Sequence, residues 1–205
     1  MPLAKCPTRL LRQSRAVALR WWLARMPSNI EIKAILRDRA AAEAIAAGLS
    51  GNGPEILHQI DVFFRSTDAR LKLRILGPDR GELIRYQRAN RAEVRPSRYA
   101  IARTPDPEIL LDILSKALGQ AGTVKKTRQV YLVGQTRVHI DAVEELGDFL
   151  ELEVVLRPGQ SEAEGRQIAL DLLARFNIET GDLLADAYVD LLDARGKAGT
   201  ERHSW

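Results

Sequence analysis

Residues 136–156 read TRVHIDAVEELGDFLELEVVL, and this stretch decides the fold. In its first half, Arg137, His139 and Asp141 fall on alternating positions with Val138 and Ile140 between them. In its second half, Glu151 and Glu153 do the same. Successive side chains of a β-strand point to opposite faces. The stretch therefore predicts two strands, each with one charged face and one apolar face.

The same alternation continues outward along the chain and marks about eight strands. The predicted strands cover residues 29–36, 56–65, 70–76, 82–88, 97–103, 123–133, 136–143 and 148–156. Apolar residues at helical spacing predict helices over 37–51, 105–119, 161–176 and 182–192. Turn residues at 77–81 and 134–135 indicate two hairpins, so the strands that flank them are expected to be antiparallel neighbours.

Charged side chains share one face on many of these strands, and two folds explain this. A flat sheet with a solvated charged face and helices on its apolar face accounts for any single strand. The distribution of sign favours a closed barrel, because bases gather on the middle strands and the Glu151 and Glu153 pair lies on the last one. We expect an α+β fold, a closed antiparallel barrel of about eight strands with helices packed outside and a charged interior.

The charge of the chain is unevenly distributed. The formal net charge is +4, but residues 1–25 hold six of the 31 bases and no acid. The remaining chain has 25 bases against 27 acids, so its overall charge does not indicate a nucleic-acid partner. We interpret 1–25 as a basic leader or a mis-called start, with targeting as the alternative. One domain is expected over 26–194, followed by a flexible tail over 195–205.

Several kinds of site are excluded by composition and motifs. The single cysteine allows no internal disulfide, and three scattered histidines lack the spacing of a zinc site. No stretch reaches the roughly 20 apolar residues of a membrane span. Neither a glycine-rich phosphate loop nor a nucleophile paired with a histidine is recognisable. A reducing compartment fits this composition, and we expect a cytoplasmic protein with no membrane partner.

The ordered motifs also resemble a known family, the CYTH superfamily of triphosphate tunnel metalloenzymes. The similarity lies in NIEIK (29–33), QIDVFF (59–64), RLKLR (70–74), LIRYQR (83–88), VKKTRQVYL (124–132) and the block at 136–156. This superfamily includes class IV adenylyl cyclases, thiamine triphosphatases and inorganic triphosphatases. The resemblance covers residues 29 to 192, and its wording is most similar to the class IV cyclase branch.

The resemblance implies two sets of site residues. The catalytic and metal-binding set would hold one or two Mg²⁺ or Mn²⁺ ions and comprises Glu31, Asp141, Glu151 and Glu153. The second set would bind the triphosphate oxygens and comprises Lys33, Lys72, Arg74, Arg88, Lys126, Arg128 and Arg137. Seven bases against four acids give the interior an expected excess of three positive charges. Arg85 is the alternative to Arg88. At position 29 this chain has Asn, whereas the family usually has an acid there.

Three classes of function remain open. The favoured one is a metal-dependent enzyme that converts ATP to cyclic AMP and pyrophosphate. With water as the attacking group, the same site would be a triphosphatase for thiamine triphosphate, nucleoside triphosphate or tripolyphosphate. Asn29 keeps a non-catalytic nucleotide- or polyphosphate-binding module open. RNA binding through the leader has little support.

His139 is interpreted as structural. The expected partner is a triphosphate-containing small molecule, and a homodimer stays open.

Overall fold

The computed structural model describes residues 28–67, 69–87 and 95–201 of the chain. The leader predicted over 1–25 lies outside the described residues, as do the last four residues of the predicted tail. The expectations for these two segments therefore stay predictions.

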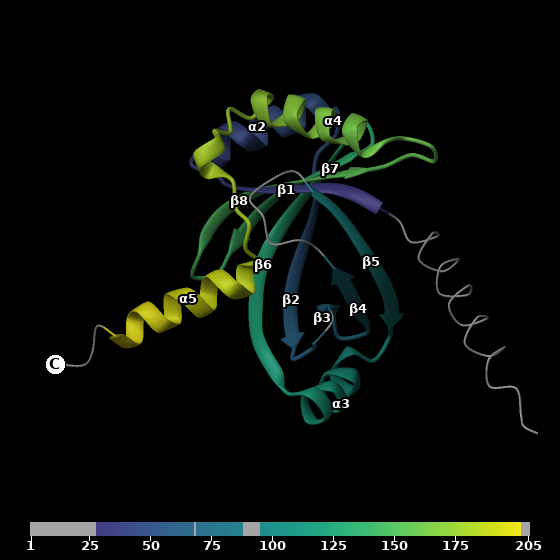
Figure 1. Ribbon diagram of the computed structural model, residues 1–205, viewed down its shortest axis with the longest axis vertical. Helices are drawn as coiled ribbons and strands as arrows, with labels where there is room; N and C mark the ends of the chain where they lie inside the picture. Colours follow the sequence, from purple (N-terminus) through teal and green to yellow (C-terminus); the bar gives the residue numbers. More distant parts are fainter. Residues whose placement is uncertain (1–27, 68, 88–94, 202–205) are drawn as a thin grey trace, which may run out of the picture.

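Eight antiparallel strands form a closed barrel (Figure 1). They are β1 (Ser28–Ile35), β2 (Glu55–Phe64), β3 (Arg70–Gly77), β4 (Arg80–Gln87), β5 (Arg95–Thr104), β6 (Gln120–Val133), β7 (Thr136–Val143) and β8 (Gly147–Val155). Their order around the barrel is β1-β5-β4-β3-β2-β6-β7-β8, so β1 pairs with both β5 and β8. The predicted fold class is confirmed, and the strands begin and end within a few residues of the predicted positions.

Both predicted hairpins are present. One joins β3 to β4, and the other joins β6 to β7 through Gly134. Gly134 has a φ of 59°, a left-handed conformation that glycine adopts without strain. Its position in the turn allows Val133 and Thr136 to pair directly.

Within the described residues, four α-helices accompany the barrel, and one of them differs from the prediction. They are α2 (Arg39–Ser50), α3 (Pro107–Leu118), α4 (Glu162–Arg175) and α5 (Tyr188–Glu201). The helix predicted over 182–192 was wrong in its first part, because an extended stretch separates a short 3-10 helix (Thr180–Asp182) from α5. No helix of the described chain is long and apolar enough to cross a membrane.

The extended stretch before α5 is held by β1 and by a helix cap. Leu183 forms a β-bridge with Ala34, and the Leu184 amide donates to the Lys33 carbonyl at 2.9 Å. These bonds require an extended backbone. The Asp190 carboxylate accepts a hydrogen bond from the Ala187 amide at 3.1 Å and so marks where the helix begins.

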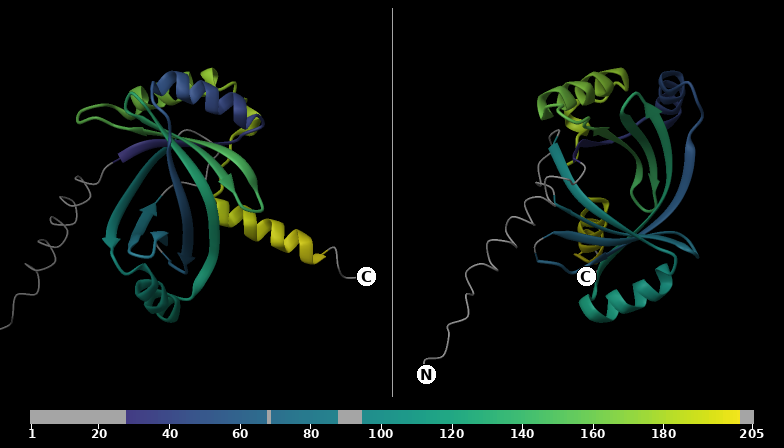
Figure 2. Two further views of the ribbon diagram at one scale, coloured as in Figure 1. Left: turned by 180° about the vertical axis from the view of Figure 1, so that it is seen from behind. Right: turned by 90° about the vertical axis from the view of Figure 1, so that its right-hand side faces the viewer.

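The outer face of the barrel is apolar and packs against helices on two sides. Helices α2 and α4 lie over β1, β7 and β8, whereas α3 lies on the opposite side of the barrel (Figures 1 and 2). The core beneath α4 contains Ile30, Ile140 and Leu152, none of which is exposed. The apolar faces of these strands thus point outward, and their charged faces are left to line the interior.

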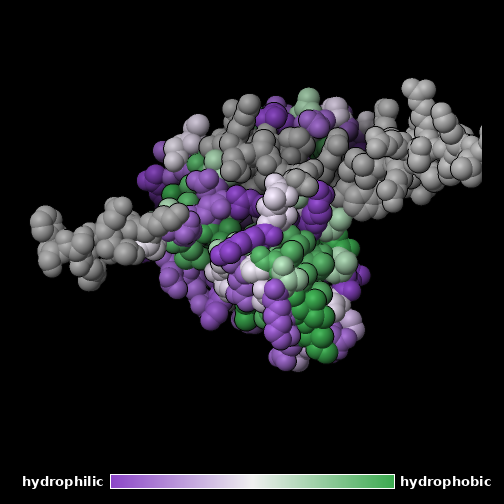
Figure 3. All heavy atoms as spheres, turned by 60° about the horizontal axis from the view of Figure 1, so that its bottom comes forward, coloured by the Kyte–Doolittle hydropathy of each residue, from purple (hydrophilic) through white to green (hydrophobic). Residues whose placement is uncertain are grey.

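Helix α3 is only partly covered. Leu110, Leu111 and Leu114 pack on the cluster formed by β2 and β3. Ile109 and Ile113 remain 63% and 54% exposed. Figure 3, which brings this end of the molecule forward, shows hydrophobic side chains at the surface.

Gly165 of α4 lies against the barrel so closely that a larger residue should destabilise the fold. A Cβ atom there would lie 2.8 Å from Ile30 Cγ1 and would also clash with Leu156. We expect Gly165→Ala to lower the free energy of unfolding by about 1–3 kcal/mol, measured by urea titration. Gly48→Ala in α2 is the matched control, because nothing lies within 4 Å of its Cβ position. The control should raise stability by up to about 1 kcal/mol, and equal effects in both variants would contradict the packing argument.

Candidate functional site

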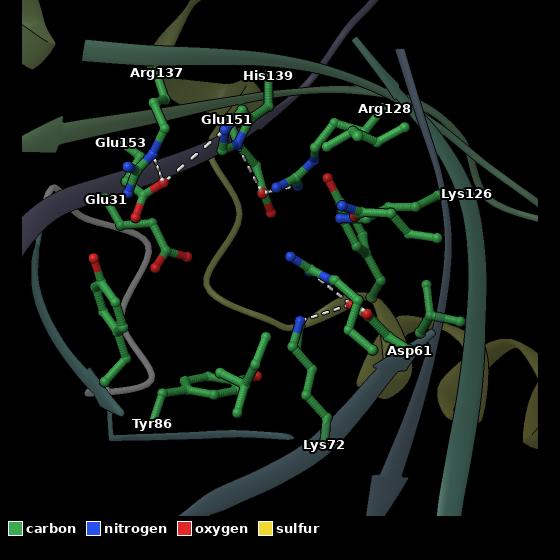
Figure 4. Close-up of a pocket in the computed structure, with 18 of the residues that line it drawn as sticks. Glu31, Asp61, Lys72, Tyr86, Lys126, Arg128, Arg137, His139, Glu151 and Glu153 are labelled. Atoms are coloured by element: carbon green, nitrogen blue, oxygen red, sulfur yellow. Dashed lines mark hydrogen bonds and ion pairs between the residues drawn. The ribbon is translucent and has the colours of Figure 1, made fainter. Parts of the chain in front are cut away.

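The barrel encloses a cavity of about 390 Å³ (Figure 4). Charged residues reach it from β1, β2, β3, β6, β7 and β8 because their strands alternate as the sequence indicates. The residues predicted for the site that line this cavity are Glu31, Lys33, Lys72, Arg74, Lys126, Arg128, Arg137, Glu151 and Glu153. Arg88 lies outside the described residues. Its alternative, Arg85, faces away, because Ile84 and Tyr86 on either side of it line the cavity.

Asp141 does not line the cavity but lies behind its basic wall. The carboxylate is fully buried and accepts hydrogen bonds from Lys126 Nζ at 3.0 Å and from Arg128 Nε at 2.6 Å. The Tyr188 hydroxyl donates a further bond at 3.0 Å. Burial would raise the pKa of Asp141, but the Arg128 and Lys126 charges outweigh burial and hold it below its usual range. These contacts make Asp141 a positioning residue for Lys126 and Arg128, and its role as a metal ligand stays a prediction.

A second buried carboxylate, Asp61 on β2, plays the same part for β3. Lys72 Nζ lies 2.6 Å from one oxygen, and Arg74 Nε lies 2.8 Å from the other. Burial opposes ionisation, yet Lys72 and Arg74 hold the pKa of Asp61 well below its usual range. The sequence analysis did not single out Asp61. The signal was present, because Gln59, Asp61 and Phe63 alternate with apolar residues and all face the cavity.

The charges of the interior are more nearly balanced than the sequence suggested. Six bases line the described part of the cavity, together with the acids Glu31, Glu55, Asp61, Glu151 and Glu153. Asp141 behind the wall makes the acids six as well. The expected excess of three positive charges is therefore not found among the described residues.

The acids of β1 and β8 form a compact group. Glu31 is the direct cross-strand partner of Glu153, and Lys33 is the partner of Glu151. Lys33 Nζ lies 3.0 Å from Glu151 Oε1, and Arg128 contacts the other oxygen. Burial would raise the pKa of Glu151, but Lys33 and Arg128 lower it well below its usual range. Two carboxylates at directly opposed positions repel each other, so the Glu31 and Glu153 pair favours a bound cation.

Glu153 is also held by its neighbours on both sides. Arg137 Nε donates to Glu153 Oε2 at 2.7 Å, and the Asn29 amide donates to Oε1. Asn29 is 2% exposed, and its own carbonyl oxygen has no hydrogen-bond partner. An unpaired buried oxygen beside two carboxylates is a suitable donor for a hard cation.

The acids by themselves do not form a complete metal site. Within residues 28–67, 69–87 and 95–201, no three His, Cys, Asp or Glu side chains gather closely enough to hold a metal ion. Magnesium in proteins commonly takes only one or two carboxylates and completes its shell with water and substrate phosphates. Glu31, Glu153 and the Asn29 carbonyl fit a cation that binds together with a phosphate ligand.

His139 lies between the two acids of β8 but bonds to neither. Its ring nitrogens are 3.8 Å from Glu151 and 4.0 Å from Glu153, beyond hydrogen-bond distance. Burial and the Arg128 charge lower the pKa of His139, so the ring is neutral near pH 7. Nδ1 of His139 is buried without a hydrogen-bond partner, and the structural role of this residue stays a prediction.

Tyr188, at the start of α5, was missed by the sequence analysis because its segment resembles an ordinary amphipathic helix. Its ring lies 3.6 Å from Lys33 Nζ and packs against Phe149 with a centroid distance of 4.8 Å. Together with Ala187 it lines the cavity. Tyr188 thus connects a base of β1 with the carboxylate of Asp141.

Lys72 provides a test of the site through pH. Burial and the Arg74 charge lower the pKa of Lys72 from 10.5 to about 7, although Asp61 opposes this shift. Above that pH the empty protein loses a charge that bound phosphate would restore. Triphosphate affinity, measured by calorimetry, should therefore fall by up to roughly tenfold per pH unit. Lys72→Arg should flatten this dependence because arginine stays charged. Equal slopes for both proteins would exclude Lys72 as its cause.

The fold and the site together define the class of protein: an antiparallel barrel whose central cavity is lined by bases and carboxylates. The sequence model of the CYTH domain matches residues 28–188, and the chain belongs to the CYTH domain family. A Methanocaldococcus jannaschii protein, provisionally named an adenylate cyclase, is 26% identical over 134 residues, which are 64% of this chain and 75% of that protein.

Solved structures share the fold. The PH1012 protein of Pyrococcus horikoshii has a TM-score of 0.71 at 22% identity, over 80% of this chain and 98% of that chain. A Vibrio parahaemolyticus protein, also provisionally described as an adenylate cyclase, has a TM-score of 0.64 at 17% identity, over 80% of this chain and 97% of that chain. At these identities the likeness concerns the fold alone.

Proposed function

We propose that this chain is a divalent-metal-dependent enzyme that acts on a triphosphate-containing substrate, converting ATP to cyclic AMP and pyrophosphate. The observation that carries this proposal is one cavity in which six bases face an opposed carboxylate pair, Glu31 and Glu153. Phosphate oxygens and a hard cation are the ligands that such a combination suits. Membership of the CYTH domain family supports the same reading.

The residues of the cavity would have different roles according to their positions. Lys72, Arg74, Lys126 and Arg128 are oriented by Asp61 and Asp141, so these side chains are already positioned when the triphosphate arrives. Lys33 and Arg137 border the acids. Bound Mg²⁺ or Mn²⁺ would be held by Glu31 and Glu153, and it would offset the charge that develops on the reacting phosphate.

In the cyclase reaction, the ribose 3′-oxygen forms a bond to the α-phosphorus as the bond to the bridging oxygen breaks. Pyrophosphate leaves, and the hydroxyl proton passes to solvent or to a cavity acceptor. The bases would bind the departing pyrophosphate more tightly as its charge grows.

We place this activity in the cytoplasm, because a chain with a single cysteine forms no internal disulfide and fits a reducing compartment.

Two alternatives stay open, and a specific observation favours the second. Water in place of the 3′-hydroxyl would make the same site a triphosphatase for thiamine triphosphate, nucleoside triphosphate or tripolyphosphate. The second is a binding module without turnover. It is favoured by the environment of Glu153, whose oxygens are both engaged by Asn29 and Arg137.

The deciding experiment is to incubate the full chain with ATP, thiamine triphosphate and tripolyphosphate, each with Mg²⁺, Mn²⁺ or a chelator, and to identify the products. Cyclic AMP with pyrophosphate supports the proposal. Orthophosphate identifies a triphosphatase, and binding without product identifies a binding module. Absence of binding to all three ligands would reject the triphosphate site itself.

A further inference from the structure

The tyrosines of this chain are concentrated on the cavity. The chain has four tyrosines, and only 5% of its residues are aromatic. Three of the four, Tyr86, Tyr99 and Tyr188, line the barrel interior. Tyr188 is already engaged with Lys33 and Asp141. Tyr86 and Tyr99 lie on a different wall, which the triphosphate and metal sites leave unexplained.

That wall is formed by β4 and β5, and in its described part it presents no charged side chain to the cavity. Tyr86 is the direct cross-strand partner of Tyr99, and Ile84 is the partner of Ile101. All four side chains line the cavity. Figure 4 shows Tyr86 facing the cavity across from Glu31. The cavity therefore has one apolar and aromatic wall, whereas the remaining strands supply its charges.

Packing within the protein does not fully account for this wall. Tyr86 packs in part against the cluster around Phe63 and Phe149, and Ile84 is buried. Ile101, however, is 47% exposed although it lies on the cavity. A ring bound against this wall would remove this apolar surface from water.

The aromatic wall adjoins the anion-binding residues. Tyr99 lines the same cavity as Arg137 and is close enough to raise the pKa of that guanidinium, and Arg137 donates to Glu153. Lys72 Nζ lies 5.9 Å from the centre of the Tyr86 ring. A group attached to a phosphate chain bound by Arg137 and Lys72 would thus lie next to the tyrosines. A bare polyphosphate gains nothing from this surface, whereas a planar ring can stack on it.

We propose that the β4–β5 wall, made by Ile84, Tyr86, Tyr99 and Ile101, is a subsite for a planar organic ring carried by the triphosphate. This inference rests on the proposed function and narrows its substrates to organic triphosphates with an aromatic base, as distinct from inorganic polyphosphate. Any planar aromatic ring can stack in this way, so the wall would favour ligands that carry a ring but would not distinguish one ring from another.

Calorimetry on the full-length protein with chelator, where turnover cannot occur, tests the inference on the wild type alone. The ligands are ATP, thiamine triphosphate, tripolyphosphate and ribose 5-triphosphate, which keeps the sugar but lacks the base. ATP or thiamine triphosphate should bind roughly tenfold or more tightly than the two ligands without a ring. The tighter of the two identifies the ring. Equal affinities for all four would overturn the subsite but leave the triphosphate site standing, whereas no binding at all would reject both.

Variants of Tyr86 give an independent readout. Tyr86→Leu should reduce the ratio of ring-ligand affinity to tripolyphosphate affinity by roughly tenfold. Tyr86→Phe should preserve the ratio because it keeps the ring, and circular dichroism should show that both variants fold. A ratio that is the same in the wild type and in Tyr86→Leu would overturn the inference. Should the leucine variant fail to fold, the ligand series on the wild type still decides.

Discussion

Replacing Glu153 with glutamine is expected to abolish metal-dependent turnover while triphosphate binding persists. Glutamine keeps the size of the side chain and can still accept a hydrogen bond from Arg137, so the basic residues stay in place. The charge opposite Glu31 is lost. Changes even to residues that only support metal ligands cost about 10–100-fold in metal affinity or activity. We expect a loss of more than about a hundredfold in kcat at saturating ATP and a shift of the metal titration to higher concentration.

Arg128→Ala is the contrasting variant, because it removes a proposed phosphate-binding side chain and leaves Glu31 and Glu153 unchanged. One lost charge-assisted pair should weaken triphosphate binding by about 1.5–3 kcal/mol, which is roughly tenfold to a hundredfold. Excess substrate should recover part of the rate in this variant but none in Glu153→Gln. Full activity of both variants across metal and substrate titrations would remove the two residues from the site.

Asp141→Asn should cost more stability than any surface change in this chain. The substitution leaves the buried Lys126 and Arg128 without the carboxylate that neutralises them. Removal of one partner of a buried pair typically costs about 3–5 kcal/mol. Urea unfolding should show a loss of this size, and an Asp141→Asn protein as stable as the wild type would contradict the role assigned to this carboxylate.

Tripolyphosphate should restore part of the stability lost in Asp141→Asn, because its charges can neutralise the same bases and because a ligand that binds only the folded state stabilises it. Gly165→Ala is the matched control, since it destabilises the barrel without changing the charge of the cavity. The ligand should add more stability to Asp141→Asn than to Gly165→Ala. Equal increments would show that the stability loss has no connection with the phosphate-binding bases.

The barrel could be predicted from the sequence because its strands alternate so regularly. One alternating pattern assigns Ile30 and Ile32 to the outer core and Glu31 and Lys33 to the interior, and the structure confirms both faces. The start of α5 could not be predicted in this way. It depends on the bond between the Leu184 amide and the Lys33 carbonyl, a contact between residues far apart in the chain.

Many of the side chains that line the cavity could be predicted from the sequence, but their arrangement within it could not. Alternation brings the bases and Glu31, Glu151 and Glu153 into one cavity. It does not distinguish a side chain at the cavity surface from one behind it, such as Asp141. Tyr188 could not be found at all, since it reaches the interior from a segment that follows the barrel in sequence.

The pairing of β1 with β5 and β8 has a consequence for synthesis on the ribosome. The first strand emerges long before either neighbour, and its last partner ends at Val155. Until then β1 is an unpaired edge, which is the kind of segment that joins other chains into aggregates. Charged side chains on an edge strand oppose such pairing. Glu31 and Lys33 would therefore protect the nascent chain from aggregation before the barrel closes. A variant with apolar residues at both positions should aggregate during expression.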